Sequence, residues 1–246
     1  MKTLAIYNVK GGVGKTAAAV NLAALAAASG LPTLLWDLDP QGAASWYLHA
    51  DGGRSPEKSV WRGDKAIGER IVRSPYPGLD VIPSDLGARH LDVWLRKDDD
   101  DHGTLRALTA PLSERYALLI FDCPPSLSHV ADAVFAAADQ VLVPVVPTHL
   151  SLRALMTLIE YFAANGLPRE RLRPFWSMAD RRRLLHRLLI ETPPKPMRDV
   201  CHSVIPYSAT IERMGEARAP LVQFAAGTPA ADAYQALWQE LAPALR

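Results

Sequence analysis

Short apolar runs alternate along the chain with longer stretches in which apolar residues recur at helical spacing. The runs at 118–121 and 141–143 are apolar at successive positions, which is typical of parallel strands buried on both faces. We predict strands at 4–9, 33–37, 79–83, 117–122, 140–146, 174–178 and 200–205. We predict helices at 15–29, 86–96, 104–112, 128–138, 151–165, 181–190 and 228–245.

Strand–helix alternation predicts an α/β fold, with a mostly parallel twisted sheet of about seven to eight strands and helices on both faces. Residues 1–246 contain no internal repeat or long linker, so we expect one domain. Right-handed crossovers place the carboxyl ends of parallel strands at one edge, where ligands bind. Residues 49–78, 97–103 and 193–196 are predicted surface loops.

Composition narrows the function classes without choosing one. The 246 residues are 49% hydrophobic and 22% charged, which excludes a disordered or fibrous chain. The net charge of +1 gives no overall field, but arginines gather in the C-terminal part, a hint of an anionic partner. Cys123 and Cys201 are too few for a disulfide framework, and no signal peptide or spanning segment is evident. We therefore expect a cytoplasmic protein.

A glycine-rich segment, Lys-Gly-Gly-Val-Gly-Lys-Thr at 10–16, lies between the first predicted strand and an alanine-rich helix. Glycines allow a tight turn that aims several backbone N–H groups at one point, and the helix N-terminus adds its positive end. Lys15 would supply a charge for phosphates and Thr16 a hydroxyl for Mg²⁺. Asn8 replaces the first glycine of the general G-x-x-x-x-G-K-[ST] pattern. The predicted nucleotide-binding residues here are Lys10, Gly11, Gly12, Val13, Gly14, Lys15, Thr16 and Ala17.

Three aspartates follow predicted strands on the same edge as this loop. Asp37 and Asp39 close the second strand, and Asp122 ends the strand at 117–122. Asp37 and Asp39 are two residues apart, so on an extended strand their side chains would point the same way. A carboxylate there can support Mg²⁺ or orient an attacking water. With Thr16, the three aspartates form the predicted metal site.

Three sequence motifs resemble those of the ParA/MinD family of P-loop ATPases. They are the loop at 10–16, Asp-x-Asp-Pro-Gln-Gly at 37–42 and Asp-Cys-Pro-Pro at 122–125. The Pro-Gln pair favours its ParA-type partition branch. The resemblance implies Mg²⁺-dependent ATP hydrolysis by a homodimer that encloses two ATP molecules. It further implies that Lys10 contacts the phosphates bound by the other subunit, and that Lys10, Lys15 and Asp39 are catalytic. The implied role is to position or segregate a cargo with a ParB-like or other adaptor that stimulates hydrolysis.

The C-terminal third resembles the family more loosely. Segments 177–181 and 204–206 are similar to those that frame adenine, which suggests Met178 and Pro206. Phosphate backbones attract arginine clusters without regard to sequence, and the resemblance implies non-specific DNA binding and nucleoid association. The family's usual arginine positions after Pro206 hold Tyr207 and Thr210 instead. Arg183 and Arg187 would share one helix face with Arg182 beside it. The predicted DNA-binding residues are Arg182, Arg183, Arg187, Arg213 and Arg218.

Three other interpretations of the sequence were weighed against the partition ATPase. A metabolic ATP-dependent enzyme of the dethiobiotin-synthetase type would need substrate groups near the γ-phosphate, and no clear candidate is present. A MinD-like membrane cycle needs a basic amphipathic terminal helix, whereas residues 239–246 hold one cation and a proline, so no membrane partner is expected. A shared iron–sulfur cluster is a third, weaker reading, because Pro-Pro follows Cys123.

Overall fold

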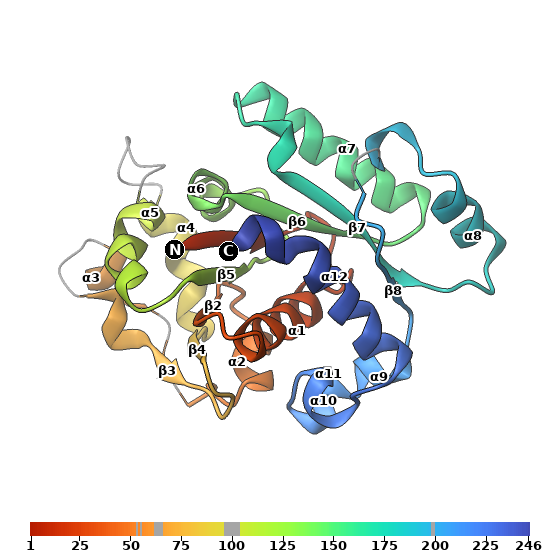
Figure 1. Cartoon of the computed structure of the whole chain (residues 1–246). Coiled ribbons are helices and arrows are strands. Elements are labelled where there is room, and N and C mark those ends of the chain that lie inside the picture. Colours follow the sequence, from red (N-terminus) through yellow and green to blue (C-terminus); the bar gives the residue numbers. More distant parts are fainter. Residues whose placement is uncertain (53, 55, 62–65, 96–103, 198–199) are drawn as a thin grey trace.

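The centre of the protein is a sheet of eight strands in the order β3-β4-β2-β5-β1-β6-β7-β8 (Figure 1). The computed structural model describes residues 1–52, 54, 56–61, 66–95, 104–197 and 200–246. β3 pairs with β4 in antiparallel fashion, and the other neighbouring strands are parallel. The strands are β1 (Lys2–Ile6), β2 (Thr33–Asp37), β3 (Val72–Arg73), β4 (Leu79–Ile82), β5 (Leu118–Asp122), β6 (Gln140–Val145), β7 (Leu172–Ala179) and β8 (Val204–Pro206).

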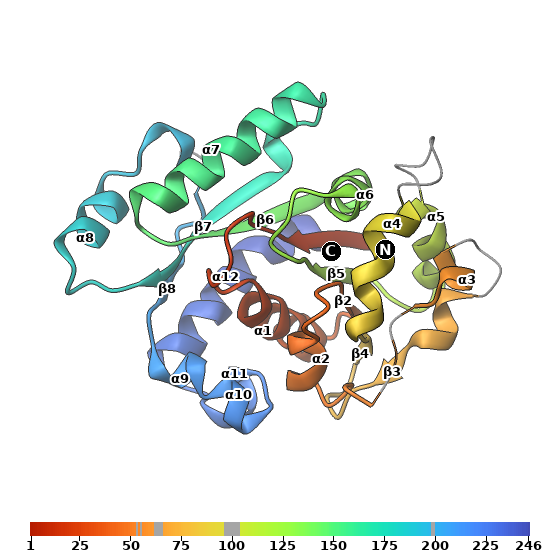
Figure 2. The same cartoon turned by 180° about the vertical axis from the view of Figure 1, so that it is seen from behind.

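Helices connect the strands and cover both faces of the sheet (Figures 1 and 2). The α-helices are α1 (Lys15–Ala28), α2 (Ala43–Tyr47), α3 (Lys58–Trp61), α4 (Leu91–Leu95), α5 (Thr104–Thr109), α6 (His129–Ala137), α7 (His149–Ala164), α8 (Leu184–Glu191), α9 (Ala209–Glu212), α10 (Met214–Ala217), α11 (Leu221–Phe224) and α12 (Pro229–Leu245). The 3-10 helices are η1 (Ile67–Arg70), η2 (Leu86–His90), η3 (Ala110–Glu114), η4 (Arg169–Arg171) and η5 (Lys195–Met197).

Two hydrophobic cores lie on the opposite faces of the sheet. Leu119 and Phe121 of β5 face a core shared with α4–α7, whereas Leu118 and Ile120 face a core shared with α1 and α12. Both sets are fully buried. The successive apolar positions that predicted two-sided burial are therefore confirmed in β5.

The register of the central strands assembles one edge of the sheet. Asp122 at the end of β5 lies opposite Ile6 of β1 on one side and opposite Asp37 of β2 on the other. The loop at 10–16 follows β1, so it reaches the same edge as both aspartates. The predicted α/β fold, its eight mostly parallel strands and this common edge are confirmed.

Several element boundaries differ from the prediction. The short strand β3 lies within the predicted loop 49–78, and the predicted helix 86–96 is a 3-10 turn followed by α4. α8 begins only at Leu184, because residues 181–183 form the turn that leads into it. The predicted loop 97–103 lies outside the described residues. In the parts of the chain that the structure describes, no helix has the length and apolar character to cross a membrane.

Candidate functional site

The loop between β1 and α1 turns tightly into the N-terminus of the helix. Gly12 and Gly14 have φ angles of +68° and +90°, a left-handed conformation that glycine adopts without strain. Gly14 is the N-cap of α1, so no cap side chain accepts a hydrogen bond from the N–H groups of the first turn, and that turn contains no acidic residue. A helix N-terminus left in this state is suited to bind an anion.

Asn8 explains how the loop tolerates the loss of its first glycine. Its side-chain amide donates to the carbonyl of Pro144 in β6 (2.8 Å), and its Oδ1 accepts from the backbone N–H of Lys10 (2.9 Å). Asn8 is 1% exposed. The side chain therefore fixes the start of the loop against β6, a role that the motif does not reveal.

Lys15 reaches back over the loop from the first position of α1. The residue is 7% exposed, and its ammonium donates to the carbonyl of Lys10 (3.3 Å). Burial lowers the pKa of Lys15, and the nearby carboxylates of Asp122 and Asp39 oppose that shift. The loop lysine and two of the predicted metal-site aspartates thus share one electrostatic environment.

Asp122 has the least satisfied carboxylate of the site. It is 0% exposed, and neither oxygen has a hydrogen-bond partner of ordinary geometry. Burial and then the charge of Asp37 raise its pKa well above the usual value, while the hydroxyl of Thr16 lies close enough to lower it. A buried carboxylate without partners is costly unless a cation completes it, so the pair Thr16 and Asp122 fits a hard cation such as Mg²⁺.

Asp37 and Asp39 differ from each other more than the sequence suggested. β2 ends at Asp37, so Asp39 lies beyond the strand, and the common direction of the two side chains stays a prediction. Asp37 accepts from the N–H (2.9 Å) and hydroxyl (2.7 Å) of Ser45 in α2 and from the N–H of Asp39 (3.1 Å). Burial raises the pKa of Asp37 to about 6, and the Ser45 hydrogen bonds oppose that rise. Asp39 is half-buried and accepts from the N–H of Gln41 (3.0 Å).

Ser45 is a site residue that the sequence analysis missed, because a serine in a short helix belongs to no motif. It is fully buried and connects Asp37 to the segment after β4, since its hydroxyl also accepts from the N–H of Ser84 (2.9 Å). Asp37 therefore holds the segment after β2 in place through its hydrogen bonds, whereas the carboxylate oxygens of Asp122 have no hydrogen-bond partner of ordinary geometry. The roles of both aspartates toward a metal stay predictions.

The segments expected near adenine lie at the ends of β7 and β8. The buried hydroxyl of Ser177 donates to the carbonyl of Val13 (2.8 Å), which joins the end of β7 to the glycine loop. Met178 has a φ of +53°, and the strand irregularity beside it brings Ala179 opposite Pro206. The structure thus places Met178 and Pro206 at the same sheet edge as the loop, and their contact with a base stays a prediction.

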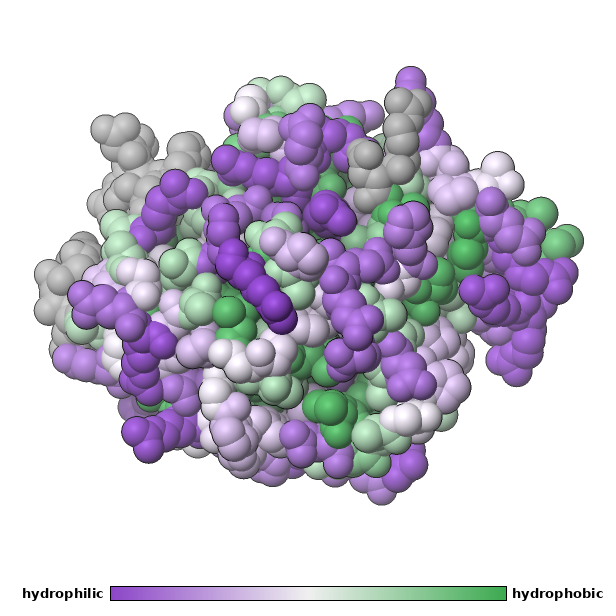
Figure 3. Space-filling model, in the orientation of Figure 1, coloured by the Kyte–Doolittle hydropathy of each residue, from purple (hydrophilic) through white to green (hydrophobic). Residues whose placement is uncertain are grey.

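The predicted DNA-binding arginines fall into two groups. Arg182 and Arg183 lie in the turn before α8 and pair with Asp180 (3.0 and 3.7 Å), and Arg187 follows on α8. Figure 3 shows hydrophilic side chains beside apolar ones at the edge where Figure 1 places α8. Arg183 and Arg187 were expected on one helix face with Arg182 beside them, but Arg183 is the N-cap of α8, so of these three arginines only Arg187 lies within the helix. Arg213 and Arg218 flank α10, which both cartoon views place far from α8.

Arg218 is occupied by contacts within the protein. Its guanidinium pairs with Asp51, lies 3.7 Å from the ring centroid of Trp46, and donates to the carbonyl of Trp46 (3.1 Å). Arg213 is exposed and lies 3.7 Å from Glu216. Of the five predicted arginines, Arg218 therefore has the smallest free surface to offer a phosphate.

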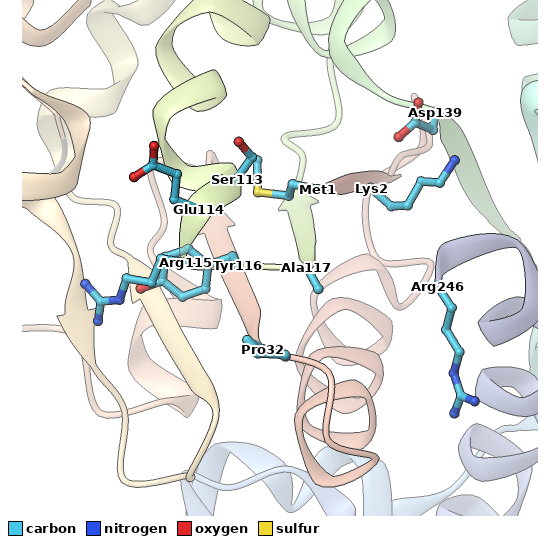
Figure 4. Close-up of a pocket in the computed structure, with 10 residues that line it drawn as sticks. All are labelled: Met1, Lys2, Pro32, Ser113, Glu114, Arg115, Tyr116, Ala117, Asp139 and Arg246. Carbon is cyan, nitrogen blue, oxygen red and sulfur yellow. The ribbon is translucent and has the colours of Figure 1, made fainter.

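A hollow of about 710 Å³ lies at the amino end of the sheet, opposite the loop. Figure 4 shows that its cations Lys2, Arg115 and Arg246 point in different directions rather than toward one point. Arg115 is already paired with Asp80 (2.7 Å). Among the described residues, no group of three or more His, Cys, Asp or Glu side chains is arranged to hold a metal, and this includes Asp37, Asp39 and Asp122. Because the cations of the hollow do not converge, the carboxyl edge of the sheet stays the candidate phosphate site.

The described features define a P-loop NTPase fold. They are a glycine loop after β1, a lysine and a threonine that begin α1, and a buried aspartate on a neighbouring parallel strand. Residues 1–166 match the family described as the AAA domain, and the chain belongs to that family. The chromosome partitioning protein ParA of Caulobacter vibrioides is 36% identical over 167 residues, which cover 65% of this chain and 61% of that protein. The ParA-type resemblance seen in the motifs is thereby confirmed.

Two further comparisons extend over nearly the whole chain. The chromosome partitioning protein ParA of Myxococcus xanthus is 29% identical over 250 residues, covering 98% of this chain and 87% of that protein. The crystal structure of cobyrinic acid a,c-diamide synthase from Mycobacterium smegmatis with a bound ATP analog and magnesium has a TM-score of 0.79 at 23% identity, covering 98% of this chain and 94% of that one. The latter likeness shows the fold alone. This chain spans 61% of the length of the Caulobacter relative.

Proposed function

We propose that residues 1–246 act as one Mg²⁺-dependent ATPase, which hydrolyses ATP to ADP and phosphate. In this proposal the ATP-bound form is a homodimer that binds DNA non-specifically and positions or segregates a cargo. A ParB-like or other adaptor protein stimulates hydrolysis and releases the dimer, so the protein is cytoplasmic and associated with the nucleoid. The names of the ParA relatives and the three motif boxes support this reading.

The observation that carries the proposal is the bare carboxylate of Asp122. It is fully buried and without hydrogen-bond partners of ordinary geometry, it lies near the hydroxyl of Thr16, and the ammonium of Lys15 shares its environment. A buried charge in this state needs a counterion, and a triphosphate with Mg²⁺ supplies charges of both signs. The glycine loop, with its uncapped helix N-terminus, provides the adjoining anion site.

Each side chain then has a definite task. Thr16 and Asp122 would hold Mg²⁺, which neutralises charge on the β- and γ-phosphates when bound. Lys15 binds the phosphates directly, and the backbone N–H groups after Gly14 orient them. Asp39, half-buried at the rim and free of the strand, orients the attacking water. Asp37 fixes the segment after β2 through Ser45.

The experiment that tests this proposal uses Asp39→Ala in the full chain with ATP and Mg²⁺. We expect phosphate release to fall at least about tenfold while a dimer accumulates, because Asp39 is placed to orient water rather than to bind phosphate. Light scattering after size-exclusion chromatography measures the dimer. Glu170→Ala is the matched control, since Glu170 is exposed at the amino end of β7 and should change neither quantity. Unchanged hydrolysis in Asp39→Ala would remove Asp39 from this role.

The same assay separates the proposal from the metabolic alternative. A metabolic enzyme would hydrolyse ATP only when a small carboxylate or amine substrate is added, and DNA with an adaptor would have no effect. A positioning ATPase would respond to DNA with the adaptor and ignore small acceptors. The fold cannot decide between them, because the diamide synthase has the same architecture.

A further inference from the structure

Arg218, which follows α10, holds the outer side of α2. Its guanidinium lies 3.7 Å from the centroid of the Trp46 ring and donates to the Trp46 carbonyl (3.1 Å). It also forms an ion pair with Asp51, in the segment after α2. The indole N–H of Trp46 in turn donates to the carbonyl of Gly215 in α10 (3.4 Å). The side chain of Arg218 therefore ties α2 to the C-terminal part of the chain.

The backbone of Arg218 adopts a conformation that arginine does not favour. Its φ of +46° and ψ of +48° lie in the left-handed region, which costs free energy for any residue with a Cβ. Tyr76, in the turn before β4, donates its hydroxyl to the Arg218 carbonyl (3.4 Å). A glycine would adopt this conformation without strain, so the backbone gives no reason for a long cationic side chain here. The contacts with Trp46 and Asp51 supply that reason.

The buried side of α2 holds the segment that carries Asp39. The N–H and hydroxyl of Ser45 donate to Asp37 (2.9 and 2.7 Å), whose other oxygen accepts from the N–H of Asp39 (3.1 Å). Gly42 donates to the carbonyl of Asp39 (2.8 Å) and is the N-cap of α2. Because only a tight turn separates Asp39 from α2, a shift of this helix would move the Asp39 carboxylate.

We propose that Arg218 is a positioning residue for hydrolysis, which fixes α2 from outside and thereby sets where the Asp39 carboxylate lies. The inference rests on the proposed function, because there Asp39 orients the attacking water. It gives Arg218 a role other than the predicted contact with DNA. Lys15 and Thr16 are not among the residues that make these contacts, so the affinity for ATP should not depend on Arg218.

The experiment compares Arg218→Gly with Arg218→Ala in the full chain. Both variants lose the contacts with α2, but only the alanine keeps the left-handed strain, so Arg218→Gly should unfold at the higher temperature of the two. We expect kcat to fall about threefold to tenfold in both, with an unchanged Kd for ATP. Phosphate release at saturating ATP and Mg²⁺, titration calorimetry and thermal unfolding measure the three quantities. If only the less stable Arg218→Ala were slow, the role would be structural and the proposal would fail.

A double variant tests the route through Asp39. Arg218→Gly added to Asp39→Ala should cause no further loss of kcat, because the group that Arg218 positions is already absent. An additive loss would mean that Arg218 acts elsewhere and would overturn the proposal. Glu216→Ala is the matched control, since this exposed side chain of α10 lies 3.7 Å from Arg213 and should hydrolyse ATP normally. A normal kcat in Arg218→Gly with weakened DNA binding would overturn the proposal and assign the residue to DNA.

A further readout does not depend on hydrolysis. Hydrogen exchange of the α2 backbone, followed by mass spectrometry without nucleotide, reports whether the helix is held. We expect exchange at Ser45 and Trp46, whose N–H groups donate to Asp37 and Gly42 (both 2.9 Å), to rise several-fold in Arg218→Gly. Unchanged exchange would overturn the hold on α2, and raised exchange with a normal kcat would overturn the positioning role. If exchange rises but Asp39→Ala hydrolyses ATP as fast as wild type, the hold is supported and the proposed function fails.

Discussion

Two regions of this protein are predicted to bind phosphate, and they are built in opposite ways. At the carboxyl edge of the central strands, Asp122 is 0% exposed and lacks hydrogen-bond partners of ordinary geometry. Before α8, the side chain of Arg182 is 86% exposed and already forms an ion pair with Asp180. A buried group without partners has a large free-energy reason to bind a ligand, whereas an exposed, paired cation has a small one. The two regions should therefore respond very differently to mutation.

The largest effect should follow Lys15→Ala at the buried site. This change removes the ammonium that shares the environment of Asp122, so we expect ATP affinity to fall at least about a hundredfold, a loss of roughly 3 kcal/mol. Isothermal titration calorimetry with ATP and Mg²⁺ measures it. Lys2→Ala, at the opposite end of β1, is the control and should bind ATP normally. Retained affinity in Lys15→Ala would refute the assignment of the loop.

A smaller effect of the opposite sign is expected for Asp122→Asn without nucleotide. The amide removes the burial cost of a charged group, so the free energy of unfolding should rise by about 1–3 kcal/mol although Mg²⁺-ATP binding is lost. Urea unfolding checks the first outcome and calorimetry the second. A destabilised Asp122→Asn would show that the carboxylate is satisfied in the empty protein.

The same variant should change the dependence of stability on pH. The folded-state pKa of Asp37 is raised to about 6, and that of Asp122 is also raised, so the folded protein binds these protons more tightly than the unfolded chain. The contribution of Asp37 is complete below pH of about 4 and is lost as the pH rises through about 6, whereas that of Asp122 is lost as the pH rises through its own raised pKa. Asp122→Asn should flatten that slope, and nucleotide with Mg²⁺ should reverse it in wild type.

The smallest effect belongs to the arginine region. Reversing the charges of Arg182, Arg183 and Arg187 to Glu should weaken DNA binding by the ATP-bound dimer about tenfold and reduce the salt slope by about 3, without changing dimerisation. Fluorescence anisotropy at several salt concentrations measures both. A control with the same loss of net charge reverses three exposed arginines elsewhere, namely Arg89, Arg106 and Arg246. If both triple variants weaken DNA binding equally, net charge alone is responsible.

The same contrast explains how far the sequence could predict the molecule. The strands and the meeting of Lys15, Thr16 and Asp122 were predictable, because two-sided burial leaves a clear apolar pattern and parallel strands share one edge. Asp37 and Asp39 were predicted as a similar pair, but β2 ends between them and Ser45 binds only the first. The end of a strand depends on contacts across the fold that no local spacing encodes.

The arginine surface was predicted less well for a related reason. Arg182 precedes α8 because Asp180 holds the turn, and Arg218 is taken up by Asp51 and Trp46, which lie more than 160 residues earlier in the chain. The hydrogen bond that the Lys10 ammonium donates to the hydroxyl of Ser151 was not predicted, because the two residues lie 141 positions apart in the chain. Polar contacts between distant segments carry no periodic signal in the sequence.

The two edge strands of the sheet bear on how the protein avoids aggregation. One side ends in the two-residue strand β3, and the other in the three-residue strand β8, which finishes on a proline without a backbone donor. Strands this short offer little template for adding another chain's strand, so growth into open-ended sheets is disfavoured.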